Sequence, residues 1–485
     1  MRKNSSKFPE KFIFGFSEAG FQFEMGLPGS EDPNSDWWQW VHDPDNILSG
    51  LVSGDLPEDG PAYWHLYKQD HDLACYLGMR GARLGIEWSR IFPKPTFEVK
   101  VPVEEDEEGN ILSIEVDEKA LEQLDKLANK EAVEHYRKIF EDWKNRGNYL
   151  IINLYHWPLP LWIHDAVKVR KFGPNQAPAG WVDKRTTVEF VKFAAYIAWK
   201  LGDLPDSWST MNEPNVVYVN GYINLKAGFP PAYPDFEMAL KAKKFMAEAH
   251  ARAYDVLKKL TGKTVGIIYA MRALDPLKPD NKECEEALEK ARAFETYNFL
   301  DAIILGKSQL FGNRPDLASH VDWIGVNYYT RRVIEPAENI LGYRFAEGYG
   351  NMCVPKGLSK DGRPCTDAGY EFYPEGLYNV LIELWERYKP LPLIITENGL
   401  ADSEDMLRPI YLSSHLYQLL RALKTGVDVK GYLYWAVTDN YEWSSGYKMR
   451  FGLAKVDYKT KKRILRPSSL IFKEIAENKE LPFDM

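Results

Sequence analysis

The chain has 485 residues, with 61 Lys and Arg against 70 Asp and Glu, so its formal net charge is −9. This length buries a core large enough to need no disulfides or metals for stability, and barrel folds use such a length as one domain. The acidic balance excludes a nucleic-acid partner, because no basic stripe with interleaved aromatic residues opposes it.

Short β-branched and aromatic runs alternate with helical patterns along the whole chain, without a break in composition. The predicted strands are Phe12–Ser17, Arg83–Trp88, Tyr149–His156, Ser207–Asn212, Thr264–Ala270, Val321–Tyr329, Leu393–Thr396 and Gly431–Thr438. The predicted helices include Asp117–Asn145, Lys184–Lys200, Phe236–Leu260, Pro374–Tyr388 and Leu412–Leu423. Eight strands that are each followed by helical sequence predict an α/β fold, a single (β/α)8 TIM barrel over residues 1–485. An open doubly wound sheet is disfavoured because no GxGxxG turn follows an early strand.

Two segments exceed a minimal barrel. Residues 104–110 are acidic and lie between Val-rich runs, which predicts an inserted hairpin after the second strand. Residues 335–366 form an irregular, Gly-rich segment after the sixth strand. In a (β/α)8 barrel we expect both segments on the C-terminal face, where active sites are built. The acidic run itself predicts a solvated surface.

The cysteines and histidines give no signal for a metal or a disulfide. The four cysteines are scattered and form no CxxC pair, and the nine histidines show no ligand spacing. No run of 18 apolar residues predicts a transmembrane segment. No apolar h-region follows the basic N-terminus, so no signal peptide is expected. These observations predict a metal-free protein in a reducing compartment, the cytoplasm.

Two glutamates close predicted strands. Glu213 follows a strand and precedes Pro214, which favours an extended backbone at the strand's C-terminal tip. Glu397 follows another strand and precedes a turn signal, Asn398-Gly399. A charged glutamate beside a buried strand is costly unless it is solvated, paired or used. A single glutamate of this kind is most simply explained as a surface residue. Two of them on the same face of one barrel favour a catalytic function.

Paired carboxylates suit glycoside hydrolysis. Their separation is about 5–5.5 Å in retaining enzymes and about 6.5–9.5 Å in inverting ones, a gap that a sequence does not measure. The chain also holds 15 Trp, 28 Tyr and 23 Phe. These rings fill a core or form a flat platform for a sugar, and composition does not choose between the two.

The motifs around both glutamates resemble glycoside hydrolase family 1, the retaining β-glucosidases and β-galactosidases. Thr210–Pro214 and Ile395–Gly399 are similar to its acid/base and nucleophile signatures. Further similar stretches follow in family order: Phe14–Ser17, Gly20–Gln22, Arg83–Phe92, Leu154–Trp157, Asn327–Tyr329, Tyr373–Leu377 and Asp439–Trp443. The resemblance covers essentially the whole chain and is strongest to the branch found in thermophilic archaea.

The resemblance implies a role for individual residues. Glu213 matches the general acid and base, Glu397 the nucleophile, and Arg83 and Tyr329 the residues that hold the nucleophile. Sugar binding is implied for Gln22, His156, Trp157, Asn212, Asn327, Trp435, Glu442 and Trp443. Taken singly, most of these have ordinary structural explanations, such as a core histidine or an ion-paired arginine. Their joint occurrence in family order favours function.

The resemblance also implies the substrate class. Members that act on 6-phosphosugars carry Ser, Lys and Tyr where this chain has Glu442, Met449 and Phe451, so unphosphorylated sugars are expected. Members that prefer mannosides change the residues matching Arg83 and Asn212, which are intact here. We expect an exo-acting β-glucosidase or β-galactosidase that uses no cofactor and no metal, and relatives suggest a homotetramer. A β-mannosidase or a lipid-linked glycoside hydrolase is the alternative, and a non-catalytic carbohydrate-binding barrel is a remote one.

Overall fold

The computed structural model describes residues 6–309 and 312–482 of the chain. Eight parallel strands pair in the order β10, β11, β1, β2, β5, β6, β7 and β8, and β8 pairs with β10 to close the ring. The barrel strands are β1 (Ile13–Ser17), β2 (Gly81–Gly85), β5 (Tyr149–Asn153), β6 (Ser207–Asn212), β7 (Thr264–Pro276), β8 (Trp323–Pro336), β10 (Leu393–Asn398) and β11 (Val429–Tyr434). The predicted (β/α)8 barrel is therefore confirmed.

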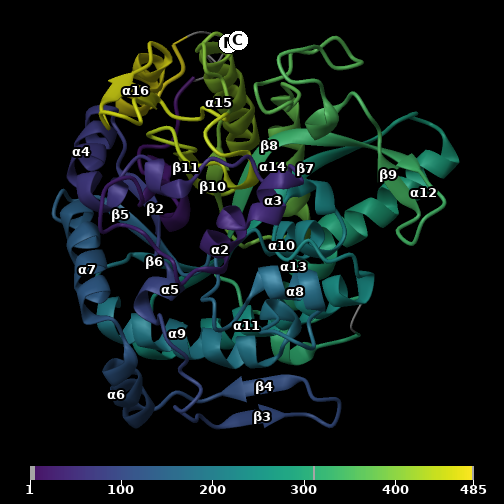
Figure 1. The fold of residues 1–485 in the computed structure, drawn as a ribbon. Coiled ribbons are helices and arrows are strands. Elements are labelled where there is room, and N and C mark those ends of the chain that lie inside the picture. Colours follow the sequence, from purple (N-terminus) through teal and green to yellow (C-terminus); the bar gives the residue numbers. More distant parts are fainter. Residues whose placement is uncertain (1–5, 310–311, 483–485) are drawn as a thin grey trace.

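A layer of helices surrounds these strands (Figure 1). One helix of this outer layer follows each strand along the chain, and all but α13 have more than ten residues: α4 (Tyr63–Tyr76), α7 (Lys130–Lys144), α9 (Arg185–Leu201), α11 (Phe236–Thr261), α13 (Asn298–Leu305), α14 (Glu375–Tyr388), α15 (Arg408–Lys424) and α16 (Ser468–Asn478). Local sequence sets their ends. The Asp235 side chain caps α11 by accepting from the Met238 amide, and Gly262 ends it with a left-handed φ of 66°.

Shorter elements occupy the connections. They include α1 (Gly20–Phe23), α2 (Asp36–His42), α3 (Pro44–Leu48), α5 (Trp88–Ile91), α6 (Glu118–Leu127), α8 (Ala166–Phe172), α10 (Pro214–Tyr222), α12 (Lys282–Ala291), β9 (Tyr343–Phe345), β12 (Ala454–Val456) and β13 (Arg463–Leu465). The helix predicted for Asp117–Asn145 is two helices, α6 and α7. They separate because the Asn129 side chain caps α7 by accepting from the Ala132 amide.

β7 and β8 are longer than predicted. They remain paired beyond the barrel as far as Pro276 and Ile334, with an irregular register between Met271 and Ala273. Such an irregularity re-aims side chains, and these extensions stand beside the mouth of the barrel.

The acidic hairpin exists, but its predicted position is wrong. β3 (Val103–Glu105) and β4 (Ile111–Ile114) pair antiparallel, as expected. Arg252 of α11 donates to the Leu112 carbonyl, and Lys184 pairs with Glu105 at 2.6 Å. The hairpin therefore lies against the outside of the helical layer, at the bottom of Figure 1, rather than on the C-terminal face. These two contacts hold the hairpin at the helical layer, away from the C-terminal ends of the barrel strands.

The structure contains a disulfide for which the sequence analysis found no signal. Cys353 and Cys365 form a disulfide, whereas Cys75 and Cys284 are free. Loop folding brings the two Cα atoms to 6.2 Å, and a spacing of 12 residues carries no sequence signal for that approach. Within the described ranges no helix has the length and apolarity to cross a membrane. Residues 1–5, on which the signal-peptide expectation partly rests, lie outside the described residues.

Candidate active site

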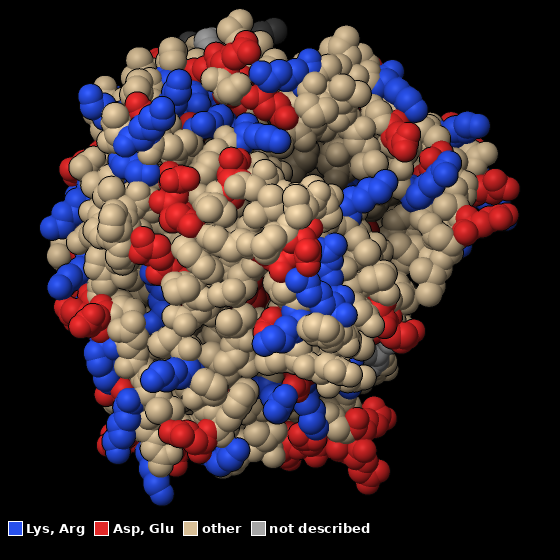
Figure 2. Space-filling view, in the orientation of Figure 1, with Lys and Arg blue, Asp and Glu red and all other residues tan. Residues whose placement is uncertain are grey.

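A cleft of about 300 Å³ opens at the C-terminal ends of the strands. Figure 2 shows the surface hollowed in the area where Figure 1 places β7 and β8. Ten of the twelve predicted site residues line this cleft: Gln22, His156, Trp157, Glu213, Asn327, Tyr329, Glu397, Trp435, Glu442 and Trp443. The other two, Arg83 and Asn212, are fully buried and contact the lining residues from behind. The structure therefore brings all twelve together.

Glu213 lies at the tip of β6, as predicted, but its backbone is not extended. Its φ of 49° and ψ of 56° are left-handed, which is rare for a non-glycine residue and unexpected before Pro214. The Glu213 amide donates to the Ile268 carbonyl at 2.9 Å, and α10 begins directly after it. Neighbouring elements thus hold a strained backbone that turns the carboxyl into the cleft. Asn327 Nδ2 donates to Glu213 Oε1 at 2.8 Å.

Glu397 lies within β10, which continues through Asn398, two residues past its predicted end. Its carboxyl forms an ion pair with Arg83 and accepts a hydrogen bond of 2.7 Å from the Tyr329 hydroxyl. A Cβ atom at Gly399 would lie 2.0 Å from the Trp435 carbonyl oxygen. Only glycine permits this close approach, which seats Trp435 beside Glu397.

A buried layer of polar side chains supports both glutamates. Arg83 Nη1 contacts His156 Nδ1 at 2.7 Å, and Asn327 Nδ2 donates to Asn212 Oδ1 at 3.0 Å. Thr396 Oγ1 donates to Asn327 Oδ1 at 2.7 Å. Burial and the Arg83 charge hold the pKa of His156 well below its usual value, so this imidazole is neutral. These hydrogen bonds hold Arg83 and Asn327 in position beside the two carboxyl groups.

Aromatic rings and polar side chains form the remaining wall. Gln22 Nε2 and Asn440 Nδ2 donate to Glu442 Oε2 at 3.1 and 2.8 Å. The Trp157 and Trp443 rings lie 4.5 Å apart between centroids. Most aromatic residues belong to the core clusters, and only a few, including Trp435, present a surface to the cleft. The core explanation is therefore confirmed for most of these rings, and a sugar platform stays a prediction for the rings that line the cleft.

The two glutamates differ electrostatically. Burial, and then the Glu397 charge, raise the pKa of Glu213 to about 8. Burial raises the pKa of Glu397 as well, but the Arg83 charge and the Tyr329 hydrogen bond oppose that rise. Glu213 is therefore protonated at neutral pH, and Glu397 is the carboxyl built to carry the charge. Two acids with pKa values driven apart by their surroundings are suited to separate acid and nucleophile roles.

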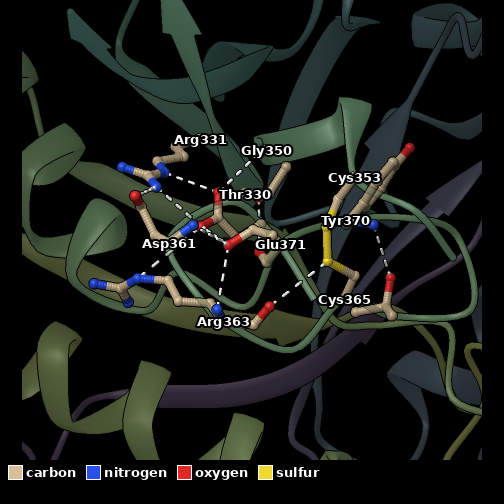
Figure 3. Close-up of a disulfide and its surroundings, with 11 residues drawn as sticks. Thr330, Arg331, Gly350, Cys353, Asp361, Arg363, Cys365, Tyr370 and Glu371 are labelled. Atoms are coloured by element: carbon tan, nitrogen blue, oxygen red, sulfur yellow. Dashed lines mark hydrogen bonds and ion pairs between the residues drawn. A yellow bond between two sulfur atoms is a disulfide. The ribbon is translucent and has the colours of Figure 1, made fainter. Parts of the chain in front are cut away.

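The segment between β8 and α14 contributes Asn351, Ala368 and Tyr370 to the cleft. This placement on the C-terminal face was expected for residues 335–366. The disulfide Cys353–Cys365 closes the loop (Figure 3).

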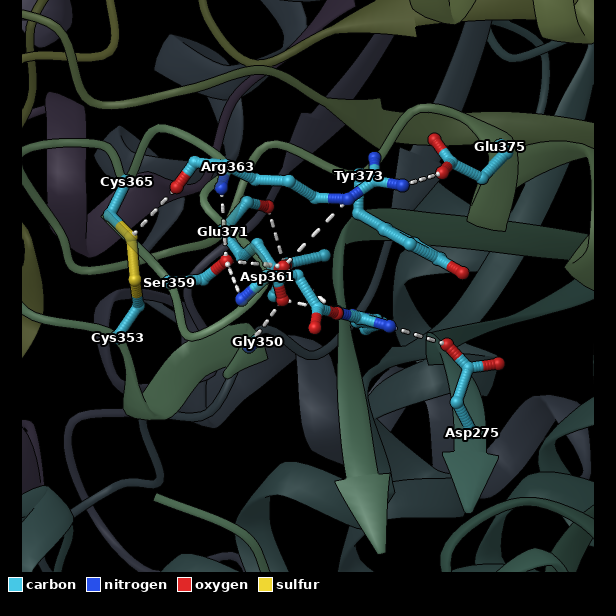
Figure 4. A network of polar contacts seen from close by, with 12 residues as sticks. Asp275, Gly350, Cys353, Ser359, Asp361, Arg363, Cys365, Glu371, Tyr373 and Glu375 are labelled. Atoms are coloured by element: carbon cyan, nitrogen blue, oxygen red, sulfur yellow. Dashed lines mark hydrogen bonds and ion pairs between the residues drawn. A yellow bond between two sulfur atoms is a disulfide. The ribbon is translucent and has the colours of Figure 1, made fainter. Parts of the chain in front are cut away.

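A buried glutamate holds the same loop together. Glu371 accepts from Arg331 Nε at 2.9 Å, from Ser359 Oγ at 2.8 Å and from the Gly350 amide at 2.8 Å (Figure 4). Because Tyr370 precedes Glu371, this network positions the Tyr370 ring at the cleft.

Sequence reasoning missed several lining residues. Arg272 on β7 and Arg332 on β8 line the cleft beyond the predicted ends of their strands. Asn220, Asn224 and Phe229, on and after α10, line its mouth. Residues Met271–Asp275 do not alternate strictly between apolar and charged side chains, so the local pattern carried no signal that β7 continues. In the described part of the chain no group of three or more His, Cys, Asp or Glu is arranged to hold a metal.

A closed parallel barrel with two differently held glutamates at its C-terminal end has the architecture of a barrel glycosidase. The profile of glycosyl hydrolase family 1 matches residues 4–101 and 125–481. The chain therefore belongs to glycosyl hydrolase family 1, in which retention of anomeric configuration is general. The unmatched residues 102–124 contain the β3–β4 hairpin, which agrees with its reading as an insertion.

Relatives with the same fold cover nearly the whole chain. The β-galactosidase of Saccharolobus solfataricus is 52% identical over 97% of this chain and 95% of its own length. The crystal structure of the β-glycosidase from Thermosphaera aggregans matches with a TM-score of 0.95 at 55% identity, over 98% of each chain. The β-glucosidase of Pyrococcus furiosus matches with a TM-score of 0.91 at 58% identity, over 98% of this chain and 97% of its own.

Proposed function

We propose that this family 1 enzyme hydrolyses β-glucosides and β-galactosides of unphosphorylated sugars from their non-reducing end, with Glu213 as acid and base and Glu397 as nucleophile. The observation that carries the assignment is the asymmetric surroundings of the two carboxyl groups. Arg83 and Tyr329 hold Glu397, whereas the pKa of Glu213 is raised to about 8.

The charge on Glu397 links the two steps of the proposed double displacement, because it changes the pKa of Glu213 between them. In the first step Glu397 attacks the anomeric carbon, and Glu213 gives its proton to the departing oxygen. The resulting ester removes the negative charge that raises the pKa of Glu213. Glu213 then becomes a stronger acid, so it is ionised when it must take a proton from water in the second step. No cofactor or metal enters this proposal.

The polar wall supports unphosphorylated sugars. Glu442 lines the cleft together with Met449 and Phe451, which offer no charged group to a phosphate. A carboxylate beside a phosphate dianion repels it, whereas it accepts hydrogen bonds from sugar hydroxyls. We expect sugar 6-phosphate glycosides to be inert.

A panel of 4-nitrophenyl β-glycosides tests the substrate class. We expect the highest kcat/KM for the glucoside and galactoside, and NMR of the first-formed sugar should show the β-anomer. A dominant mannoside activity would favour the β-mannosidase alternative, and an α-anomer as first product would contradict the double displacement.

Azide separates the two glutamate roles. In Glu397→Gly, azide should restore activity on an aryl β-glucoside and yield the α-glycosyl azide, because it attacks in place of the missing carboxylate. In Glu213→Gly, azide should yield the β-glycosyl azide, because it attacks the glycosyl-enzyme. The assignment is wrong if the two variants give the opposite products, or if Glu397→Gly keeps full activity without azide.

We further propose a homotetramer that acts in the cytoplasm. The support is one relative, a β-glucosidase mutant described as derived from a hyperthermophilic tetrameric structure, which is 58% identical over 98% of this chain. A disulfide is compatible with this compartment, since intracellular proteins of hyperthermophiles often contain them. Light scattering after size-exclusion chromatography tests the assembly, and fractionation of the source cells tests the location.

A further inference from the structure

Two arginines line one half of the cleft. Arg272 lies at the irregular register of β7 and β8, and Arg332 lies four residues beyond Tyr328 on β8. Arg332 is 6% exposed, and its Nη1 pairs with Glu295 at 3.1 Å. Among the described residues, its Nε has no hydrogen-bond partner, and Arg272 forms no hydrogen bond or ion pair.

These arginines belong to the leaving-group half. Both lie on the extensions of β7 and β8 past the barrel, where they line the cleft together with Glu213, the proposed acid, and with Tyr370 of the loop after β8. Arg83 instead lies on the barrel strand β2 and pairs with Glu397. Because Glu213 gives its proton to the departing oxygen, cations beside Glu213 and Tyr370 face the aglycone rather than the sugar.

Among the described residues no carboxylate pairs with Arg272. Glu295 neutralises Arg332 and also accepts from the Tyr343 hydroxyl at 2.8 Å. The protonated Glu213 carries no charge at neutral pH. Arg272 is therefore an unpaired guanidinium at the cleft, a state that is costly when partly buried unless solvent or a ligand compensates it.

We propose that the enzyme prefers β-glycosides whose aglycone carries an anionic group, bound by Arg272. The preference rests on the proposed function, since it assigns the leaving-group half from the role of Glu213. The planar guanidinium of Arg272 offers two parallel donors, which match a carboxylate or a sulfate. The shared chemistry is an oxyanion on the aglycone.

Matched aryl glycosides test this preference. We compare kcat/KM for the β-glucosides of 4-hydroxybenzoate and of its neutral carboxamide, with the 4-sulfophenyl β-glucoside distinguishing a tetrahedral oxyanion from a planar one. A charged hydrogen bond made in the enzyme–substrate complex should favour the carboxylate over the amide by about tenfold at low salt. The ratio should shrink at 0.5 M NaCl because salt screens a partly exposed pair.

Substitutions locate the effect. Arg272→Gln should bring the carboxylate-to-amide ratio to about one, and Arg272→Lys should retain part of it. Arg344→Gln is the matched control, since Arg344 is an exposed arginine of the neighbouring β9 that pairs with Glu335. It should leave the ratio unchanged. The ratio is the readout because it cancels any change in folding or in the rate on both substrates.

Two outcomes overturn the inference: a wild-type ratio near one with both anions, or a preference that survives in Arg272→Gln. Each leaves the proposed function intact as long as the neutral glucoside is hydrolysed. If the wild type hydrolyses neither glucoside nor galactoside, the proposed function itself fails.

Discussion

The carboxyl of Glu397 accepts a hydrogen bond from the Tyr329 hydroxyl and pairs with the Arg83 guanidinium, whereas the carboxyl of Glu213 accepts a hydrogen bond from the Asn327 side-chain amide. Both side chains are buried, so desolvation raises both pKa values. Among the described residues only Glu397 forms an ion pair, with Arg83, and this contact decides which carboxyl is ionised at neutral pH. The division of roles is thus a property of the neighbours, since the two residues are chemically identical.

Replacing Glu213 by Gln should remove the alkaline limb of the pH–rate profile. The wild type should lose kcat/KM above a pH of about 8, as Glu213 ionises and can no longer donate. In Glu213→Gln the rate on a poor leaving group should fall by about 10²–10⁴ and become flat over that range. Glu335→Gln, a change on the outer part of β8, should keep the limb. A limb that persists in Glu213→Gln would assign it to another group.

Replacing Tyr329 by Phe should move the acidic limb to higher pH. The Tyr329 hydroxyl donates to Glu397 and lowers its pKa, so its loss raises that pKa and protonates the nucleophile at a higher pH. The measurement is kcat/KM against pH on an aryl glucoside with a good leaving group. An unshifted limb would show that the hydrogen bond does not tune Glu397, and Tyr373→Phe on the adjoining segment serves as the control.

At the scale of elements, the connections rather than the barrel strands distinguish the leaving-group half. β7 and β8 extend past the barrel and carry Arg272 and Arg332, and the loop after β8 carries Tyr370. The disulfide links two parts of that loop, and Glu371 connects it to Arg331 of β8. The proposed sugar-binding half instead comes from residues at or just after the barrel strand ends, such as Trp435 and His156.

Removing the disulfide should lower stability more than it lowers sugar binding. In the chain-entropy model a loop of this size is worth about 3 kcal/mol, so Cys353→Ser with Cys365→Ser should lower Tm. A reductant should lower the Tm of the wild type and not that of the double variant. Cys284→Ser, at a free cysteine, should leave the effect of reductant in place. If reductant does not change the Tm of the wild type, the disulfide has no stabilising role.

At the scale of the whole molecule, the buried acids of the cleft lower the free energy of unfolding as pH rises. The pKa of Glu213 is about 8 in the folded protein against 4.5 for the free group. The native state then binds more protons than the unfolded state between these values, so the free energy of unfolding falls as pH rises through them. Each such group contributes a slope of about 1.4 kcal/mol per pH unit. Glu442, with a pKa of about 7, adds to the same trend up to that pH.

Glu213→Gln should therefore be more stable than the wild type at pH 8 and equally stable at pH 4. Denaturant unfolding at both values of pH measures the difference. Glu335→Gln, at a partly exposed ion pair, should show no such pH-dependent gain. An equal stability of Glu213→Gln and wild type at pH 8 would mean that Glu213 is not held protonated by the fold.

Local patterns determined the barrel and the places of its acids. The alternation of short strands with helices predicted eight parallel strands, because period and turn signals are properties of neighbouring residues. The same signals placed Glu213 and Glu397 at strand ends. They did not predict the left-handed backbone of Glu213, because the Ile268 carbonyl and α10 that hold it come from the fold around β6.

Contacts between distant segments decided the rest. The hairpin position depends on Arg252, 140 residues from Leu112, and the disulfide depends on how its loop folds. The opposite electrostatics of two identical side chains depend on Arg83, which is 314 residues from Glu397. The sequence by itself determined the architecture and the acidic pair with an overall charge of −9. Only the tertiary structure decided which acid is ionised and that Arg272 has no ion-pair partner in the described ranges, because desolvation and Coulomb energies depend on distances in space rather than along the chain.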